Sequence, residues 1–460
     1  MSTDKIYNSI EEVLDIAESA EGKTVGEFDI NNRLDSRGNK GGIGQVLEEG
    51  LFKMAVNSRA EADFVDLGLE LKVTAIKENK KNDFSAKERL VLNIINYEED
   101  YKDSFEESSF WQKNKNLLII FYLYKDELDK KDFPIIKSVL HNFDPVDLEI
   151  IKQDWQTIID KIKAGEAHNI SEGDTMYLAA CTKGANAKSI RKQPFSNIPA
   201  KQRAFSLKSS YMSAFARRVI DRQLIPSLFN VDELKSKTTL QLLQERFAPY
   251  IGKRVSEIAK LVDIPVTKNK AFNANLISAV LGVKGTKLES LREFSKANIK
   301  FKTIRLEPTG IPKEHMSFEQ IDFHRWINDA WEDSQLYEKF EYTKYLFVVF
   351  QYDETEKENK NREPYLKGIM LWNMPEVVIE HELKELWKTT KAILEEGVQL
   401  TPVRNGVSNN LPGASFNGIC HIRLKARDGK DQVELPDGQY ITKQCYWLNR
   451  EYIAEIVKEL

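Results

Sequence analysis

The chain has 460 residues, which is too long for one ordinary domain and long enough for two or three domains that each bury a core. Hydrophobic residues make up 41% and charged residues 30%, as is typical of a soluble globular protein, and no uncharged apolar run is long enough to cross a bilayer. Three scattered cysteines and six dispersed histidines argue against a disulfide framework or a zinc site. The N-terminus has no apolar signal core, so we expect a cytoplasmic protein.

Helical and strand patterns alternate along the first half. Apolar residues recur with helical period in "SIEEVLDIAESA" (9–20), in "IGQVLEEGLF" (43–52) and in an amphipathic stretch that follows Pro145 and ends at Gly165. "LGLELKV" (67–73) alternates like a strand, and "NLLIIFYLY" (116–124) is an unbroken apolar run, typical of a strand covered on both faces. This order predicts an α/β fold with a central mixed sheet flanked by helices.

The second half repeats the order of the first at an offset of about 230 residues. The matched pairs are "GKTVGEF" (22–28) with "GKRVSEI" (252–258), "NKGGIGQVLEEGLF" (39–52) with "NKAFNANLISAVLG" (269–282), "GLELKVTAI" (68–76) with "NIKFKTIRL" (298–306), "KNLLIIF" (115–121) with "KYLFVVF" (344–350), and "AFSLKSSYM" (204–212) with "QYITKQCYW" (439–447). Matches in one order indicate a duplicated domain. We expect a first domain at 1–222, a linker at 223–239 and a second domain at 240–460.

Positive charge is concentrated in one segment, although the whole chain has a net charge of −4. From Lys183 to Arg222 there are ten lysine or arginine residues and one acid, Asp221, and aromatic residues are interspersed. An ordinary solvated cationic face is the alternative. The ten-to-one excess favours a surface that binds nucleic acid.

The stretch "EADFVDLGLELKVT" (61–74) contains the residues that predict chemistry. On a strand, Glu70 and Lys72 point to the same face, and Asp63 precedes a short turn that returns it to that face. Two carboxylates beside a lysine form an oxygen-rich pocket suited to Mg²⁺. Such a metal activates water and stabilises charge on a phosphate, while the lysine orients the water or stabilises the developing charge. This is the logic of an Asp…Glu-x-Lys nuclease site.

Glu-x-Lys by itself is a weak pattern, because most examples are solvated strand faces with an ordinary ion pair. Two neighbours strengthen it. Glu48, on the preceding helix, would add a third carboxylate, or is a surface glutamate. Lys115, directly before the apolar strand, would flank the same sheet edge, or snorkels at a strand end.

The second repeat lacks this constellation. At the repeat offset, the positions of Glu48, Asp63, Glu70 and Lys72 are taken by Ser278, Glu293, Lys300 and Lys302. A lysine in place of a metal-binding carboxylate repels a divalent cation, so we expect no cleavage by the second copy. Lys344 and Lys443 stand as counterparts of Lys115 and Lys208, which favours phosphate contact there.

These residues resemble the family of the mismatch-repair nickase MutH and its restriction-enzyme relatives. The family signature K-G-x-x-G-x-x-x-E followed by D-F-x-x-L-G-x-E-L-K is filled by "KGGIGQVLE" (40–48) and "DFVDLGLELK" (63–72). "KGANAK" (183–188) and "FSLKSSYMSA" (205–214) look like that family's DNA-reading segments. The duplication with a degenerate second copy resembles the two-domain, GATC-cutting type II restriction endonucleases of this superfamily. The resemblance implies two restriction-endonuclease-like domains.

The resemblance also implies roles for the residues of the first copy. Asp63 and Glu70 are the expected metal ligands, Lys72 is the expected catalytic lysine, and Glu48 and Lys115 are expected to support catalysis.

Lys183 and its loop are expected to enter the DNA groove and read GATC. The nickase has an arginine in that loop where this chain has Cys181, so a guanine contact must come from elsewhere. Arg191, Lys192 and Arg203 are the unranked candidates for that contact. The expected DNA-binding residues are Lys183, Asn186, Lys188, Arg191, Arg203, Lys208 and Tyr211. Asn186 would pair with an adenine edge or cap a turn, and Tyr211 would contact DNA or pack in the core.

The interpretation is a Mg²⁺-dependent type II restriction endonuclease that cuts double-stranded DNA and leaves 5′-phosphate ends. The first domain would cut and the second would bind DNA or regulate. Partners would be DNA, a second molecule in a transient dimer or two-site complex, and a cognate DNA methyltransferase, with no membrane. The rival functions are a repair nickase, a DNA-binding regulator without catalysis, and a structural protein with charged strand faces.

Overall fold

The structure is a computed structural model that describes residues 5–35, 42–56, 61–79, 83–184, 189–269, 271–403 and 406–460. It divides into two compact units. Unit 1 comprises Met1–Thr238 with Ser290–Asn298, and unit 2 comprises Thr239–Glu289 with Ile299–Leu460. The segment Ser290–Asn298 thus lies in the sequence range expected for the second domain but packs with unit 1. Within the described ranges, no helix is long and apolar enough to cross a bilayer.

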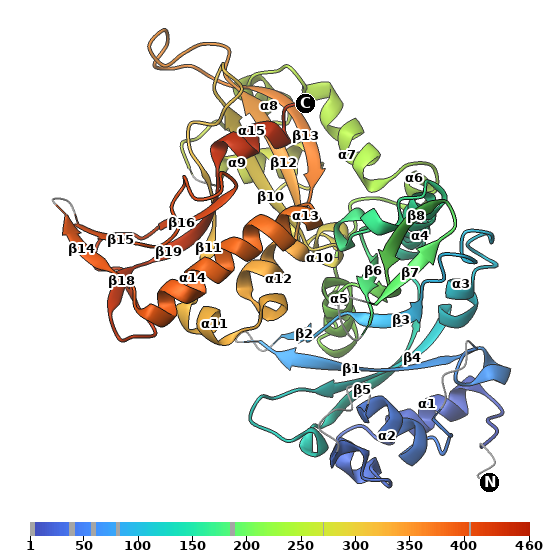
Figure 1. Ribbon diagram of the computed structural model, residues 1–460. Coiled ribbons are helices and arrows are strands. Elements are labelled where there is room, and N and C mark those ends of the chain that lie inside the picture. The colour runs from blue at the N-terminus through green and yellow to red at the C-terminus, as the bar shows by residue number, and fades with distance from the viewer. Residues whose placement is uncertain are drawn as a thin grey trace. The chain divides into compact units, whose positions relative to one another are not determined.

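A mixed sheet in the order β2-β1-β4-β5 is central to unit 1. Its strands are β1 (Glu70–Glu78), β2 (Phe84–Ala86), β4 (Asn116–Leu123) and β5 (Ile135–Asn142). β1 and β4 are parallel, whereas β2 and β5 are antiparallel to their neighbours. Figure 1 shows α1 and α2 on one face of this sheet and α5 on the other. Residues 117–121 of β4 are fully buried, as the apolar run predicts.

Unit 1 also contains a sheet in the order β3-β9-β6 and a hairpin formed by β7 and β8. These strands are β3 (Leu90–Ile94), β6 (Leu178–Thr182), β7 (Ile190–Gln193), β8 (Ser196–Lys201) and β9 (Arg203–Leu207). The helices of the unit are α1 (Ile10–Glu18), α2 (Gly42–Gly50), α3 (Ser109–Asn114), α4 (Pro145–Lys163), α5 (Ser209–Ile220), α6 (Val231–Ser236) and α10 (Arg292–Lys296).

Local sequence explains where the main helices of unit 1 begin. Ser9 caps α1 by accepting a hydrogen bond from the Glu12 amide, as the capping-box spacing predicts. α4 begins with Pro145 in its first turn, behind the N-cap Asp144. Apolar residues of α1, α2, β1 and β4 form one core cluster, which fixes α2 against the strand that follows it in the sequence.

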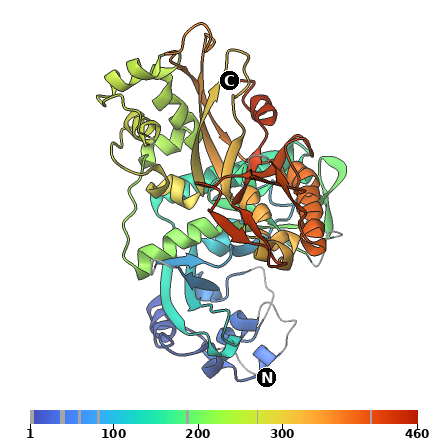
Figure 2. The same ribbon diagram turned by 90° about the vertical axis from the view of Figure 1, so that its left-hand side faces the viewer.

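Unit 2 repeats this architecture. Its sheet in the order β10-β12-β13 has one parallel and one antiparallel pairing, like β1-β4-β5. A second sheet in the order β11-β19-β16 matches β3-β9-β6, and both are antiparallel throughout. In Figure 2 the helices α7–α9 cover one face of the β10-β12-β13 sheet and α15 covers the other. The duplicated architecture confirms the predicted fold class of two mixed α/β domains.

The strands of unit 2 are β10 (Ile299–Leu306), β11 (Met316–Gln320), β12 (Lys344–Gln351), β13 (Tyr365–Trp372), β14 (Leu400–Val403), β15 (Gly406–Asn409), β16 (Cys420–Leu424), β17 (Gln432–Glu434), β18 (Tyr440–Thr442) and β19 (Gln444–Leu448). Its helices are α7 (Thr239–Phe247), α8 (Val255–Leu261), α9 (Phe272–Val280), α11 (Phe323–Asn328), α12 (Gln335–Glu341), α13 (Glu376–Val378), α14 (Lys384–Glu396) and α15 (Arg450–Ile456), and a π-helical turn, Ile379–Leu383, joins α13 to α14.

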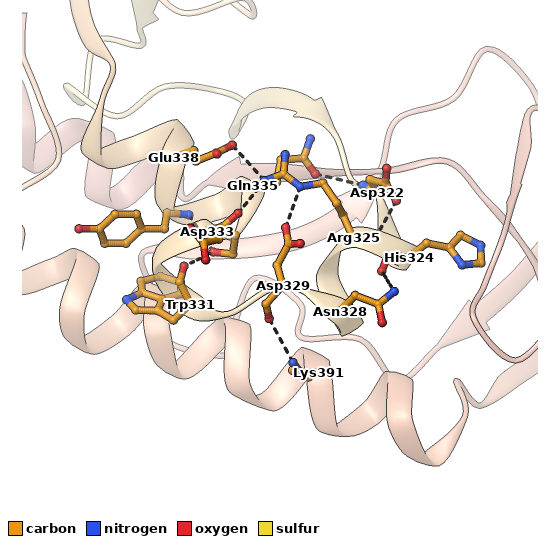
Figure 3. A network of polar contacts seen from close by, with 12 residues as sticks. Asp322, His324, Arg325, Asn328, Asp329, Trp331, Asp333, Gln335, Glu338 and Lys391 are labelled. Carbon is orange, nitrogen blue, oxygen red and sulfur yellow. Dashed lines mark hydrogen bonds and ion pairs between the residues drawn. The ribbon is translucent and has the colours of Figure 1, made fainter. Parts of the chain in front are cut away.

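A polar network holds α11 and α12 together in the connection between β11 and β12 (Figure 3). Arg325 is its centre: Nε donates to Asp329 at 2.7 Å, and Nη2 donates to Glu338 at 3.1 Å and to the Asp333 carbonyl at 2.6 Å. Asp322 caps α11 by accepting from the Arg325 amide. These contacts are structural, because every charged group in them is matched by a neighbour on the same connection.

Candidate active site

A tight loop places Asp63 beside the start of β1. Phe64 and Leu69 exchange backbone hydrogen bonds across this loop, and Gly68 closes it with φ +57°, a backbone conformation that favours glycine. The Asp63 amide donates to Glu70 Oε2 at 3.2 Å, and the Leu71 amide donates to Asp63 Oδ2 at 2.9 Å. The two carboxylates therefore converge as the sequence pattern predicts.

Two lysines face Glu70, which is only 3% exposed. Lys72 Nζ lies 2.7 Å from Glu70 Oε1, so the strand alternation does bring the two side chains to the same face. Lys113 Nζ lies 3.6 Å from the same oxygen. Both ammonium groups are largely buried, so their charge acts on the carboxylates with little screening by water.

Two carboxyl groups of the site hold their protons unusually strongly. Burial, followed by repulsion from Glu70, raises the pKa of Asp63 to about 6, although the Leu71 amide and the two lysines oppose the shift. Burial, followed by repulsion from Asp63 and Glu70, raises the pKa of Glu48 to about 7. The structure thus brings Glu48 from α2 into the electrostatic field of the other two carboxylates.

Two carboxylates of the site could hold a small divalent cation. Among the described residues, no three His, Cys, Asp or Glu side chains form a ready metal-binding group. Asp63 and Glu70 are the carboxylates that would hold the ion, with Glu48 close enough to add negative charge. One or two protein carboxylates, with water filling the remaining positions, are the usual ligand set for a small hard cation. A bound cation would also offset the repulsion that raises the pKa of Asp63 and Glu48.

Comparison with known proteins finds the family model "DNA mismatch repair enzyme MutH" twice, at residues 52–154 and 285–385. Both matches include the first strand of a repeated sheet, β1 or β10. A type II restriction enzyme, Sau3AI of Staphylococcus aureus, is 35% identical over 96% of this chain and 97% of its own length. The chain belongs to the MutH-related type II restriction endonucleases.

MutH proteins match a smaller part of this endonuclease. The DNA mismatch repair protein MutH of Shewanella woodyi is 26% identical and covers 41% of this chain and 82% of its own length. The corresponding protein of Serratia proteamaculans is 25% identical and covers 45% of this chain and 92% of its own length. The match with the restriction enzyme therefore spans both repeats, whereas each of these MutH proteins matches less than half of the chain.

Lys113 is the basic residue that the sequence analysis missed. The expected supporting lysine, Lys115, is the C-cap of α3, and the described contacts place Lys113, not Lys115, within ion-pair distance of Glu70. The interpretation of the sequence placed Lys115 just outside β4 but did not predict α3. A helix there turns the two lysines, which are two residues apart, in different directions. That helix was the missing information.

The expected DNA-binding residues fall into three groups. Lys183 and Arg191 are exposed, and Arg191 Nε donates to Gln202 at 3.2 Å. Asn186 and Lys188 lie outside the described residues. The three others, which are buried, are Arg203, Lys208 and Tyr211.

Burial argues against direct DNA contact for these three side chains of the endonuclease. Arg203 Nη1 donates to the Ala180 carbonyl at 2.8 Å, and Lys208 Nζ donates to the Thr175 carbonyl at 2.6 Å. The Tyr211 hydroxyl donates to Asp147 at 3.2 Å. Exposed fractions of 3%, 6% and 1% leave these side chains little surface for direct contact with DNA. For Tyr211 this burial favours the core alternative.

The residues at the equivalent positions of the second copy make other contacts. Lys302 Nζ donates to the Ser317 carbonyl at 2.9 Å, and burial lowers its pKa to about 8. Ser278 is buried and donates to the Asn275 carbonyl. Burial also lowers the pKa of Lys300. A buried serine and a lysine in place of Glu48 and Glu70 favour the expected loss of cleavage by this copy.

Strand register corrects two of the predicted repeat matches. Glu70 pairs with Leu117 and Lys300 pairs with Tyr345, so Lys344 corresponds to Asn116 rather than to Lys115. Leu207 and Leu448 occupy the same pairing position in β9 and β19, so Lys208 corresponds to Asn449 rather than to Lys443. Sequence similarity alone had misplaced both matches by a few residues.

Proposed function

We propose that this endonuclease cuts both strands of DNA at GATC, uses Mg²⁺, and leaves 5′-phosphate ends. The observation that carries the proposal is the contact of Asp63, Glu70 and Lys72 on one loop and strand of unit 1. Similarity to a type II restriction enzyme over nearly the whole chain supports double-strand cleavage. GATC is the site implied by the resemblance of the signature and the DNA-reading segments to the GATC-cutting branch of the superfamily.

The side chains of unit 1 have distinct parts in the proposed reaction. Asp63 and Glu70 would hold the metal, which when bound acidifies a water and stabilises charge on the phosphate. Lys72, already directed at Glu70, would orient the attacking water in line with the scissile bond. Lys113 would stabilise the negative charge that develops on the phosphate, and it would thus take the supporting place that the resemblance implied for Lys115.

Asp63→Ala tests the site. We expect this variant to lose cleavage of plasmid DNA in Mg²⁺ while it retains salt-sensitive DNA binding, because the substitution removes a ligand and not a phosphate contact. Asp66→Ala is the matched control, since Asp66 is exposed on the same loop. Equal cleavage by Asp63→Ala and the parent would overturn the site assignment.

A single-strand nickase is the second candidate, because the MutH family model matches a segment in each half of the chain. Conversion of supercoiled plasmid to linear DNA, with ends that sequence to GATC, supports the restriction enzyme. Accumulation of nicked circles alone would support the nickase. A catalytically silent regulator would give neither product, and the intact carboxylates of unit 1 argue against it.

The proposed partners follow from the presence of one competent site. Cutting both strands requires two molecules on the DNA or two sequential nicks, and we favour a transient dimer or a two-site complex. Sedimentation with and without a GATC duplex, in Ca²⁺ to prevent cutting, distinguishes two molecules on the DNA from a single molecule that makes sequential nicks. A cognate DNA methyltransferase would protect the host, and methylated plasmid should then resist cleavage. A cytoplasmic location remains a prediction.

A further inference from the structure

The segment Ser290–Asn298 belongs to the second repeat in sequence but to unit 1 in space. It contains α10 and directly precedes β10. At the repeat offset, it corresponds to the loop that carries Asp63 in the first repeat, and Glu293 stands in the position of Asp63. The remnant of a lost active site therefore packs within the unit whose active site is intact.

Glu293 acts as an anchor for the backbone. Its side chain is 0% exposed. Oε1 accepts from the Ser227 hydroxyl at 2.5 Å and from the Phe229 amide at 3.3 Å, and Oε2 accepts from the Leu228 amide at 2.9 Å. Three donors satisfy the carboxylate, so it fixes residues 227–229 to α10 and has no need of a metal.

A second set of contacts fixes α10 to α4. Lys296 Nζ forms an ion pair with Asp147, and Arg292 lies 3.2 Å from Asp147 and 3.0 Å from Asp144. Tyr211 of α5 donates to the same Asp147 carboxylate. Asp147 is 1% and Lys296 is 4% exposed. A buried carboxylate of this kind depends on its cationic partners, because an unpaired buried charge is strongly destabilising.

The contacts continue from α10 to the catalytic strand. The Ser210 hydroxyl of α5 donates to the Lys296 carbonyl at 2.6 Å. Further along α5, Ser213 Oγ accepts from the Ala86 amide of β2 at 2.9 Å, and Arg217 donates to the Phe84 carbonyl at 3.2 Å. β2 in turn pairs with residues 76–78, at the far end of β1 from Glu70, which begins the strand.

We propose that α10 is a positioning element of the endonuclease: the remnant of the second-repeat site braces α5, and through α5 and β2 it holds the catalytic strand of unit 1 in place. Glu293 and Lys296 are its positioning residues. The cleaving half of the chain therefore requires a segment encoded in the other half. The inference extends beyond the proposed cleavage at GATC, because its first test needs neither DNA nor metal.

Hydrogen exchange of the full chain is the first test. Glu293→Gln keeps the size of the side chain but removes its charge and replaces one of the two acceptor oxygens with an NH2 donor. We expect faster exchange at the Leu228 and Phe229 amides and also in α5 and β2. Glu395→Gln, at an exposed position of α14, is the matched control and should leave all of these rates unchanged. Faster exchange confined to residues 227–229 would overturn the proposal, since the contacts of α10 would then have no effect on α5 or β2.

Single-turnover cleavage is the second test. Lys296→Met removes the charge that pairs with Asp147, and Lys296→Arg keeps it. We expect Lys296→Met to lower the cleavage rate about tenfold with DNA affinity unchanged, a coupling of ordinary size between packed elements, and Lys296→Arg to restore the rate. Parent-like cleavage by a folded Lys296→Met, or equal losses in rate and DNA affinity, would contradict a positioning role. If Lys296→Met does not fold, the exchange experiment on Glu293→Gln decides.

Discussion

Glu48 and Asp63 are carboxyl groups whose surroundings oppose their ionisation. Burial is the largest cause in both, and the neighbouring carboxylates add to it. Carboxyl groups with raised pKa values are common at cation-binding sites, because the bound cation supplies the positive charge that favours their ionised form. At this scale the metal-free site is under electrostatic strain, and two predictions follow from its residues.

The first prediction concerns stability. The pKa of Glu48 is raised from 4.5 to about 7 and that of Asp63 from 3.8 to about 6. A carboxyl group whose pKa is raised in the folded state contributes stability at pH values below its usual pKa. That contribution is lost as the pH rises through the raised pKa. The metal-free protein should therefore lose stability between about pH 4 and pH 7 through this site.

Thermal unfolding with and without Ca²⁺ measures this effect. Ca²⁺ should raise Tm more at about pH 8 than at about pH 5, because the raised pKa values keep Asp63 and Glu48 largely protonated at the lower pH. Glu48→Gln removes one of the strained groups and should reduce the pH dependence of the metal-free Tm. An equal Ca²⁺ effect at both pH values would contradict the assigned cause.

The second prediction separates two lysines. Lys113→Met should lower the cleavage rate about a hundredfold, as for loss of one charge-stabilising group in an active site. Lys115→Met is the matched control, two residues away on the same connection, and should leave the rate nearly unchanged. Single-turnover rates in saturating Mg²⁺ give the comparison. A larger loss for Lys115→Met would restore the role that the resemblance implied.

At the scale of elements, β7, β8 and β9 divide the basic segment between surface and interior. Arg191 and Lys192 of β7 are exposed, whereas Arg203 at the start of β9 and Lys208 directly after it are buried.

The corresponding hairpin of unit 2, β17 with β18, differs in charge. Residues 183–203 carry six basic residues and no acid, whereas residues 425–443 carry four of each. Lys443 is paired with Asp431 at 2.6 Å. The first hairpin is therefore the stronger candidate for DNA contact.

The third prediction tests this division. Lys192→Ala should weaken DNA binding and reduce the slope of log affinity against log salt by about one, as for loss of one phosphate contact. Lys208→Met should leave that slope unchanged and lower stability by about 1–3 kcal/mol, because a buried amine that bonds the Thr175 carbonyl is lost. Binding titrations over a range of salt, with Tm measured on the same samples, distinguish a surface role from an interior one.

At the scale of the whole molecule, duplication has kept the architecture and changed the chemistry. Both units contain a parallel strand pair extended by an antiparallel strand, and a separate antiparallel sheet. Only unit 1 carries carboxylates at the start of its first strand. In the second repeat, the residue in the position of Asp63 has become an anchor, and Lys302 bonds a neighbouring strand. The loss of the second site therefore involves several residues.

The fourth prediction follows from that loss. Lys300→Glu in an Asp63→Ala background restores one carboxylate to the second copy, yet it should restore no cleavage, because Glu293 and Ser278 remain committed to other contacts. Calorimetric titration with Mn²⁺ should likewise find no new site. Recovery of cleavage by the double variant would show that the second copy needs only one residue to act.

Local residue order was enough to predict the residues of the candidate site and the duplication. Asp63, Glu70 and Lys72 are close in sequence, so a turn and the alternation of a strand suffice to bring them together. The same locality made the main helices and strands predictable. Long-range contacts decided the rest. Whether Lys113 or Lys115 meets Glu70 depends on a short helix that sequence periodicity does not mark.

Which basic residues are buried, and where the remnant of the second site packs, depends on contacts between segments that are distant in the sequence. Burial of Arg203 and Lys208 results from strand pairing with segments far away in the chain, and a list of charges contains no such information. The anchoring of Glu293 to residues 227–229 spans more than sixty positions. Local patterns reflect neighbouring residues, whereas burial and charge pairing depend on which distant segments pack together.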